Sequence, residues 1–455
     1  MKDRNVKSLT EGSPFKILIL FTLPLLLGLA FQQLYGMIDT IVVGRFLGVD
    51  ALAGVGSTGP INFLILGFCS GICSGFAIPV AQKFGEKDLP GLRRIVGNIV
   101  WLSAAFSVVI TLLVCLMCRR ILTWMHTPEE TFSYAYDYIF IIFLGIPSMI
   151  LYNVLSGIIR SLGNSRVPLY FLLFSSALNI VLDLVLILKA GMGVAGAAWA
   201  TVISQIVSGL MCLVYIVRSC PVLKLGRDDL RPRRQESGKL LSMGVPMGLQ
   251  YTVTAVGCTV LQGAVNVLGP TAMAAVSAAN RVQSLLVTPF DSIGISSATY
   301  VGQNTGAGDI GRIRGGVRAG LLMGAVWCVL GLCTVYLWGE NFLMLFLDPS
   351  GQQTGEILAW GQKFLILNAV NYLPLVCVNL FRSAVQGMGY SVPAVLAGVL
   401  ELAGRAAAAF MFVPSLGFTA VCLASPAAWI LADIFLIPMY FYGLKVLRLR
   451  IEGSK

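Results

Sequence analysis

Twelve long apolar runs, each bounded by glycine, proline or charged residues, follow one another along almost the whole chain. They fall near 15–38, 52–78, 95–117, 134–157, 168–188, 194–217, 238–263, 279–301, 317–338, 357–381, 392–413 and 418–444. A helix needs about 20 apolar residues to cross a bilayer. Only 12% of the 455 residues are charged, against roughly 25% in soluble proteins. The sequence therefore predicts an all-α integral membrane protein with twelve transmembrane helices.

Lysine and arginine gather in alternate loops between these runs. Of 32 such residues, 25 lie beside the N-terminus, in 79–94, 158–167, 218–239, 302–318 and 382–391, or in the C-terminal tail. Four lie in the other loops, and Arg281, Lys363 and Arg405 lie within runs. This bias predicts a multi-pass protein of the plasma membrane with both termini in the cytoplasm. It also accounts for the net charge of +11 without a nucleic-acid partner.

The two halves of the sequence repeat each other. Residues 48–88 align without a gap with 269–309, at an offset of 221. We therefore expect an N-lobe of spans 1–6 (1–217), a basic cytoplasmic linker (218–239) and a C-lobe of spans 7–12 (240–455). Because six spans is an even number, a pseudo-two-fold axis along the membrane normal should relate the lobes. Secondary transporters are built in this way, and we expect the protein to work as a monomer.

Other sources of energy or chemistry have no signal in the sequence. The phosphate-binding pattern GxxxxGK[ST] of ATP-driven pumps is absent, and His126 is the only histidine. An ion gradient is therefore the expected power source, and we expect no enzymatic activity, cofactor or metal centre. A membrane-embedded enzyme stays as a minor alternative.

Two acidic residues lie at membrane depth in the first half. Asp39 lies in the outer part of span 1, and Asp183 lies in span 5, four residues after Asn179 and on the same helix face. A carboxylate in the bilayer core normally faces a cavity or a partner. Two of them can accept protons or share a cation such as Na⁺, so they are predicted to form a coupling site. A structural role in joining helices is the alternative.

The second half carries a different set of polar residues. Glu401 and Arg405 in span 11 are four apart and are predicted to form an ion pair, with a structural role favoured. The roles of Asp291 and Asp433 stay open. No acid stands at Val260, Leu261 or Ala407, where the repeat places the counterparts of Asp39 and Asp183. We therefore expect only the first half to hold the coupling site.

Several motifs resemble those of the multidrug and toxin extrusion family over essentially the whole chain. They are Pro24 with the span 1 segment Gln32-Gln33-Leu-Tyr-Gly-Met-Ile-Asp39-Thr-Ile-Val-Val-Gly-Arg45-Phe-Leu-Gly48, Arg160-Ser-Leu-Gly-Asn164, Asn179 with Asp183, and Val301-Gly-Gln-Asn-Thr-Gly-Ala-Gly308.

The resemblance implies a function and a site. Members of the family export amphipathic compounds, organic cations above all, in exchange for protons or sodium ions. By this resemblance, Asp39, Asn179, Asp183 and Thr201 form a polar network whose protonation or cation occupancy bends span 1 at a hinge, Pro24. Further residues are expected to extend the network or line the substrate cavity, namely Gln32, Gln33, Asn153, Gln250 and Arg281.

The chain also departs from the family. Some members use a Glu in span 7 and an Asp in span 10 as a second cation site, where this chain has Gln250 and Asn371 or Asn379. Coupling through the first half is therefore favoured. A flippase for lipid-linked precursors, from the same superfamily, is the alternative transporter.

Overall fold

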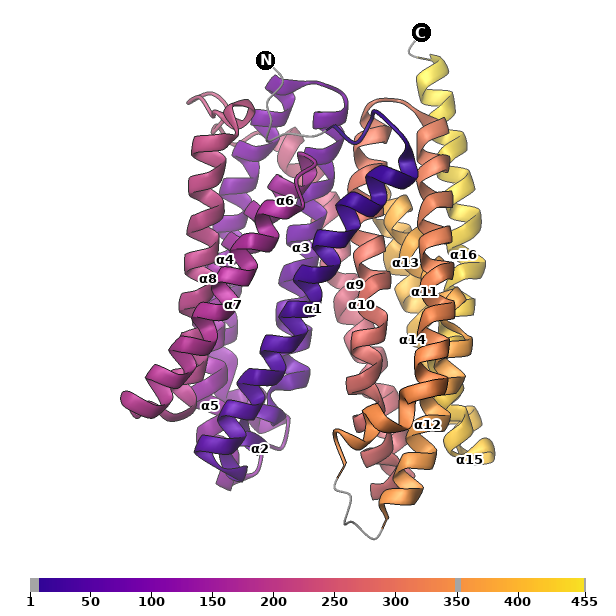
Figure 1. Cartoon of the computed structure of the whole chain (residues 1–455). Coiled ribbons are helices and arrows are strands. Elements are labelled where there is room, and N and C mark those ends of the chain that lie inside the picture. The colour runs from indigo at the N-terminus through magenta and orange to yellow at the C-terminus, as the bar shows by residue number, and fades with distance from the viewer. Residues whose placement is uncertain (1–7, 348–352, 454–455) are drawn as a thin grey trace. The chain divides into compact units, whose positions relative to one another are not determined.

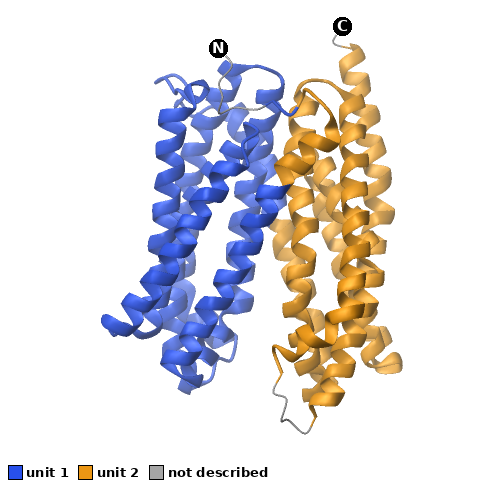
Figure 2. Ribbon diagram, viewed as in Figure 1, with its two compact units in different colours: residues 1–9, 23–248 blue, residues 10–22, 249–455 orange. Residues whose placement is uncertain are grey.

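The computed structural model describes residues 8–347 and 353–453, and every regular element in them is helical (Figure 1). Four of the basic residues counted above, Lys2, Arg4, Lys7 and Lys455, lie outside these ranges. Figure 2 shows that the chain forms two compact units. Unit 1 comprises Met1–Leu9 and Leu23–Gly248, and unit 2 comprises Thr10–Thr22 and Leu249–Lys455.

Two long helices each contribute to both units. Helix α1 (Pro14–Leu47) passes from unit 2 to unit 1 between Thr22 and Leu23, and α9 (Arg234–Val267) passes from unit 1 to unit 2 after Gly248. A proline lies beside each boundary, Pro24 in α1 and Pro246 in α9. Proline lacks the N–H that would bond to the preceding turn, so each helix is weakened where it changes unit.

Unit 1 is built on the packing of α6 against α8 and α3, and of α7 against α8. Besides its parts of α1 and α9, its helices are α2 (Val49–Ser57), α3 (Gly59–Gly85), α4 (Leu89–Trp124), α5 (Glu129–Leu144), α6 (Ile146–Ser161), α7 (Arg166–Leu184), the π-helix η1 (Val185–Lys189), α8 (Gly193–Ser219) and the 3₁₀ turn η2 (Pro221–Leu223).

In unit 2, α10 packs on α13 and α11, and α16 packs on α14 and α13. Besides its parts of α1 and α9, its helices are α10 (Pro270–Gly306), α11 (Ile310–Met344), α12 (Thr354–Val370), α13 (Tyr372–Gly387), α14 (Val392–Ala407), the π-helix η3 (Ala408–Phe412), α15 (Val413–Leu416) and α16 (Phe418–Gly453).

All twelve predicted spans fall on these helices. Among the described residues, eight helical segments are long and apolar enough to cross a membrane, and two bent pairs count as further spans. The pairs are α5 with α6, bent by 45°, and α12 with α13, bent by 52°. Helices α9 and α10 are as long but more polar, and they complete the twelve. The all-α membrane fold with twelve spans is therefore confirmed.

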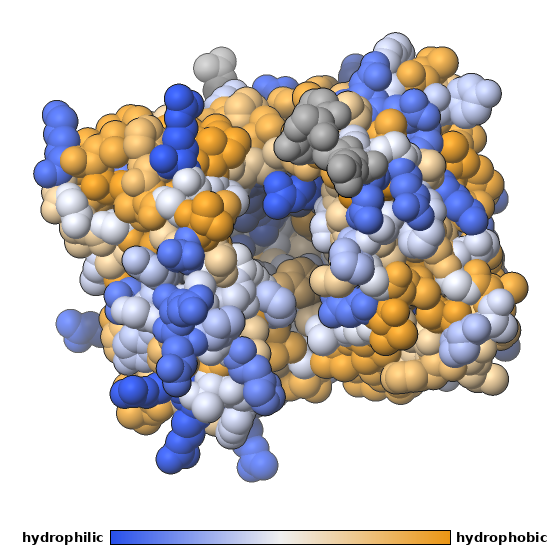
Figure 3. Space-filling view, turned by 90° about the horizontal axis from the view of Figure 1, so that it is seen from below, coloured by the Kyte–Doolittle hydropathy of each residue, from blue (hydrophilic) through white to orange (hydrophobic). Residues whose placement is uncertain are grey.

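Apolar side chains cover the outer surfaces of the helices, as lipid contact requires. Leu116 and Val217 in unit 1 and Tyr336 and Ile434 in unit 2 are each more than two-thirds exposed. Figure 3 shows hydrophobic residues around the rim of each unit and hydrophilic side chains projecting from the end in view. A soluble protein would not leave so many large apolar residues in water.

The repeat seen in the sequence recurs in the backbone. Gly48, before α2, has φ 90°, and Gly269, before α10, has φ 95°. This left-handed region favours glycine because a Cβ would clash there. Asp88 and Asp309, also an offset of 221 apart, begin α4 and α11, and each side chain accepts a hydrogen bond of 2.9 Å from a first-turn N–H. The Gly91 N–H and the nearby Lys83 ammonium hold the pKa of Asp88 below its usual value.

Glycines permit a very close approach of α3 and α9. A Cβ added at Gly75 would lie 2.5 Å from the Gly244 Cα, and one at Gly71 would lie 2.5 Å from the Met247 carbonyl oxygen. These distances are well below an ordinary carbon contact of about 3.5–4.0 Å. The crossing therefore depends on residues without side chains, a common device in membrane helices.

The basic segment 218–239 is tied to α4 in unit 1. The Arg93 Nε donates to the Val222 carbonyl at 2.9 Å, and the Trp101 Nε1 donates to the Leu230 carbonyl at 2.6 Å. The Asn98 Oδ1 accepts from the backbone N–H of Arg233 at 2.8 Å. The predicted linker thus follows a fixed path along one helix.

Candidate functional site

In unit 1, α1 and α7 bring the two predicted acids close together. Asp183 is 0% exposed, and neither of its carboxylate oxygens has a hydrogen-bond partner among the described residues. Asp39 is half-buried, and its buried Oδ1 also has no hydrogen-bond partner among the described residues. The two carboxyl groups are near enough for their charges to interact. Because two ionised carboxylates repel each other in apolar surroundings, a proton or a cation between them would stabilise this arrangement.

The predicted amides and hydroxyl lie on neighbouring helices. The Asn179 Nδ2 donates to the Thr201 Oγ1 at 3.4 Å, which joins α7 to α8. The buried Asn179 Oδ1 has no partner among the described residues. Asn153 donates to the Met149 carbonyl at 2.8 Å, inside its own helix. An amide and a hydroxyl group thus join α7 to α8 one helical turn before Asp183, and oxygen atoms are the ligands that Na⁺ prefers.

Two tyrosines that the sequence analysis did not select belong to the same group. Tyr35 in α1 and Tyr138 in α5 both lie close enough to Asp39 and Asp183 to interact with their charges. Tyr138 is 9% exposed and packs among aliphatic residues, so its sequence context is that of an ordinary core residue.

The remaining predicted residues are more dispersed. Gln32 and Gln33 are both exposed on α1. Gln250 and Arg281 belong to unit 2. The Gln250 Oε1 accepts from the Gln386 Nε2 at 2.7 Å, and the exposed Arg281 lies over the Phe346 ring at 5.6 Å. Asp39, Asn179, Asp183 and Thr201, the residues predicted to form the coupling site, thus all lie in unit 1, whereas Gln250 and Arg281 have separate partners in unit 2.

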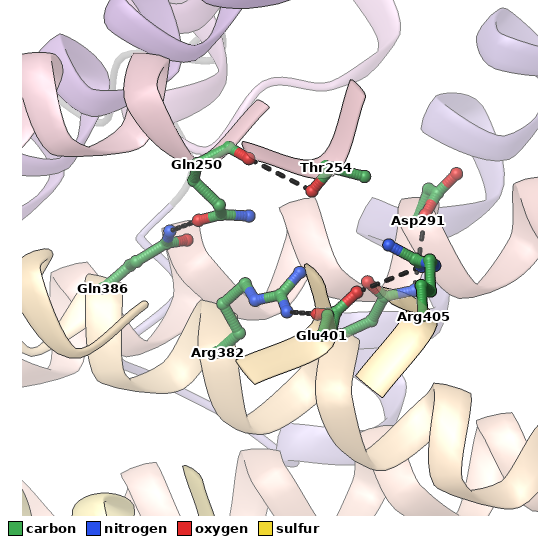
Figure 4. Close-up of polar contacts among 8 residues, drawn as sticks. Gln250, Thr254, Asp291, Arg382, Gln386, Glu401 and Arg405 are labelled. Atoms are coloured by element: carbon green, nitrogen blue, oxygen red, sulfur yellow. Dashed lines mark hydrogen bonds and ion pairs between the residues drawn. The ribbon is translucent and has the colours of Figure 1, made fainter. Parts of the chain in front are cut away.

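The predicted ion pair of span 11 is present but is part of a larger cluster. The Arg405 Nη2 donates to the Glu401 Oε2 at 3.3 Å. The other oxygen of Glu401 accepts from Arg382. The placement of Arg382 in a loop, at 382–391, was wrong, because α13 continues to Gly387 and the residue is only 8% exposed. Three buried charged groups therefore meet between α13 and α14 (Figure 4).

Two further acids lie around this cluster. The Asp291 Oδ1 accepts from the Asn379 Nδ2 at 3.3 Å, and Asp433 in α16 is 8% exposed. Both are near enough to Arg382 to interact with its charge. Asn371, the other candidate in span 10, caps α12 at the bend and donates to the Leu367 carbonyl at 2.8 Å.

A π-helical turn follows the polar pair in each half. Asp183 lies two residues before η1, and Arg405 lies three residues before η3. A π-helix is rare and is frequently found at functional sites. The pairs Asn179/Asp183 and Glu401/Arg405 therefore occupy the same part of corresponding helices, although the first is acidic and the second contains an arginine.

Unit 1 also holds an apolar cavity of about 830 Å³ between α4, α6 and α8. Val96, Ser107, Ile150, Leu213 and Lys224 are among its lining residues. It contains none of the predicted site residues. Among the described residues, no group of three or more His, Cys, Asp or Glu is placed to hold a metal ion.

Comparison with known proteins defines the family. The MatE family model matches residues 24–185 and 246–402, which together are more than half of the chain. The chain therefore belongs to the MatE family. The two matches begin at the two prolines, Pro24 and Pro246, that lie beside the boundaries between the units.

Individual relatives agree with this assignment. The chain is 30% identical to the probable multidrug resistance protein YoeA of Bacillus subtilis (strain 168), over 84% of this chain and 82% of that one. It is 23% identical to the multidrug export protein MepA of Staphylococcus haemolyticus (strain JCSC1435), over 88% of each chain.

Solved structures show the same fold. A crystal structure of MATE in complex with MaL6 has a TM-score of 0.87 at 21% identity, over 97% of this chain and 98% of that one. The outward-facing conformation of a multidrug resistance MATE family transporter also has a TM-score of 0.87, at 22% identity, over 98% and 97%.

Proposed function

We propose that this protein is an H⁺- or Na⁺-coupled antiporter that exports amphipathic, mainly cationic compounds across the plasma membrane by alternating access. The family assignment and the names of the curated relatives support drug export. The distribution of basic residues supports a cytoplasmic location for both termini. We further propose that the protein acts as a monomer.

The state of Asp183 is the observation that carries the coupling proposal. The side chain is fully buried in unit 1 and beside Asp39, and both of its oxygens lack a partner among the described residues. A purely structural carboxylate would be expected to accept hydrogen bonds, because a buried polar group without them is costly. Asp183 instead has lone pairs left for a proton or a cation.

Coupling would follow from competition for the acidic group. With no ion bound, the negative charges of Asp39 and Asp183 favour a cationic substrate. When an external H⁺ or Na⁺ neutralises them, that attraction is lost and the substrate is released outward. Asn179 and Thr201 would orient the carboxylates or contribute oxygen ligands, and Pro24 would let α1 bend as the occupancy changes.

The test is dye efflux from liposomes that contain the purified protein, with a pH gradient or a sodium gradient imposed separately. Asp183→Asn or Asp39→Asn should abolish gradient-driven efflux while the protein still inserts and folds, because an amide cannot take up the proton. Asp137→Asn, the same change at an exposed position of α5, should leave efflux unchanged. Efflux by Asp183→Asn at the wild-type rate would refute the assignment.

A further inference from the structure

The apolar cavity of unit 1 has a continuous wall of aliphatic side chains. Helix α6 packs against both α4 and α8, and the cavity of about 830 Å³ lies between these three helices. The α6 wall consists of side chains three and four residues apart, which therefore share one helix face, namely Pro147, Ile150, Leu151, Val154, Leu155 and Ile158.

The cavity is open on the side that faces lipid. Val100 of α4 and Leu213 and Val217 of α8 line it, and they are 49%, 40% and 76% exposed. They belong to membrane-spanning helices, so this exposed surface meets hydrocarbon. Among the described lining residues of the three helices, Ser103 and Ser107 are the hydroxyl-bearing ones. Water finds few hydrogen-bond partners in such a cavity, so a hydrocarbon chain suits it better.

The length of the cavity matches one half of a bilayer. Its lining residues run from Val96 to Ser107 on α4 and from Pro147 to Ile158 on α6. At 1.5 Å per residue, each of these stretches covers about 16 Å. The hydrocarbon core of a bilayer is about 30 Å thick, so the cavity has the length of an acyl chain in a single leaflet.

Basic residues lie at the end of the cavity where α8 stops. The turn η2 follows the end of α8 and packs against both α8 and α4, at the end of unit 1 where α4 begins (Figure 1). Pro221, Leu223 and Lys224 line the cavity here. The Arg93 Nε donates to the Val222 carbonyl at 2.9 Å, so a second cationic side chain is held beside η2.

The positive charge at this end is not neutralised by the protein. Among the described residues, neither Arg93 nor Lys224 belongs to an ion pair. The acids that follow Lys224 are engaged elsewhere, because Asp228 pairs with Arg231 at 3.3 Å and Asp229 accepts from a backbone N–H at 2.9 Å. An anionic group therefore fits this end of the cavity.

We propose that the cavity binds one anionic phospholipid of the cytoplasmic leaflet, with an acyl chain between α4 and α8 and the phosphate at Lys224 and Arg93. The choice of leaflet rests on the proposed cytoplasmic location of segment 218–239. A phospholipid joins an apolar chain to a negative head group in the order in which the cavity presents its walls and its charges. Basic residues just outside a membrane span attract such head groups.

A head-group comparison provides the first test. Purified full-length protein is mixed with equal amounts of dioleoyl phosphatidylglycerol, which is anionic, and dioleoyl phosphatidylcholine, which has the same chains and no net charge. Native mass spectrometry then measures which lipid stays bound. Wild type should retain one phosphatidylglycerol in preference. Lys224→Gln should weaken this binding by about fivefold, the factor for one basic residue at an anionic lipid, and leave phosphatidylcholine binding unchanged.

The matched control for the charge is Arg227→Gln. Arg227 is an exposed residue of the same basic segment that does not line the cavity. Its removal should weaken phosphatidylglycerol binding by less than about twofold, because the charge of a solvent-exposed side chain away from the lipid is screened.

A second pair of variants tests the place of the acyl chain. Ala104 and Ala105 are neighbours on α4 and both are exposed, but Ala104 lines the cavity and Ala105 does not. Ala104→Phe should weaken retention of phosphatidylglycerol by about fivefold or more, because the ring takes space that the chain needs. Ala105→Phe should leave it unchanged. Circular dichroism confirms that each variant is folded.

Three results would overturn the lipid site. They are equal retention of the two lipids by wild type, equal phosphatidylglycerol affinity of wild type and Lys224→Gln, and equal effects of the two phenylalanine variants. Displacement of the bound lipid by the cationic dye rhodamine 123 would assign the cavity to a transported compound and would also refute it. Lipid binding is measured without an ion gradient, so it can fail or succeed independently of the efflux experiment that tests the proposed function.

Discussion

The buried ion-pair cluster of unit 2 makes a quantitative prediction for stability. Glu401→Gln would leave Arg382 and Arg405 without their shared counter-charge, at positions 8% and 6% exposed. Removal of one partner from a buried pair costs about 3–5 kcal/mol, because the remaining charge is left uncompensated. Asp291 and Asp433 still interact with the charge of Arg382, so Arg405 is the charge left without a counter-ion, and we expect a cost within that range.

A matched surface pair supplies the comparison. Arg448 and Glu452 in α16 are also four residues apart and bonded at 2.8 Å, but their side chains are 69% and 57% exposed. Exposed pairs contribute about 0–1 kcal/mol. Glu452→Gln should therefore change the free energy of unfolding by less than about 1 kcal/mol.

The free energy of unfolding can be measured by titration with sodium dodecyl sulfate in mixed micelles, followed by circular dichroism. Glu401→Gln combined with Arg405→Met should recover part of the loss, because the charge left without a counter-ion is gone. Equal destabilisation by Glu401→Gln and Glu452→Gln would show that burial does not set the energy of the cluster, and the reasoning would fail.

Two further predictions concern the scaffold. Gly75→Ala should destabilise the protein by about 1–3 kcal/mol, because the new Cβ would lie 2.5 Å from the Gly244 Cα. The control is Gly263→Ala in α9, where an added Cβ would meet no atom within 4 Å, and this variant should not lower the midpoint of thermal unfolding. Equal midpoints for the two variants would contradict the close crossing of α3 and α9. Asp88→Ala should cost about 1 kcal/mol at pH 7 through loss of the cap on the Gly91 N–H. Folding lowers the pKa of Asp88. The contribution of this side chain to stability is therefore complete above the pKa of the unfolded chain, 3.8, and is lost as the pH falls through the lower pKa of the folded protein. A difference in stability between wild type and Asp88→Ala that grows on acidification would contradict this prediction.

The sequence was sufficient for the helices and for the repeat. Apolar length alone identified the spans, because a bilayer demands a minimum length of every crossing. The repeat was visible because Gly48 and Gly269 share a backbone conformation that few other residues adopt. The spacing of Glu401 and Arg405 predicted their ion pair correctly, since residues four apart on a helix are neighbours.

The sequence was insufficient where tertiary packing decides. Arg382 follows an apolar run and was interpreted as a loop residue, because the length of a helix beyond its apolar part has no clear local signal. The interaction of Tyr138 with the charges of Asp39 and Asp183 depends on where the fold places α5 relative to α1 and α7. The π-helices are likewise not encoded in any hydrophobic period, although they mark the polar pair of each half.

The passage of α1 and α9 between the units has a consequence for any attempt to divide the protein. Cleavage in the basic segment 218–239 would not yield two self-sufficient halves, because each unit borrows a helical segment from the other half of the chain. The Thr22 hydroxyl donates to the Ser296 hydroxyl at 2.8 Å, and Arg312 donates to the Gly12 carbonyl at 2.8 Å. A C-terminal fragment would lack both contacts. The two fragments should therefore fold only when they are expressed together and each supplies its helical segment to the other, and neither should be stable when made alone.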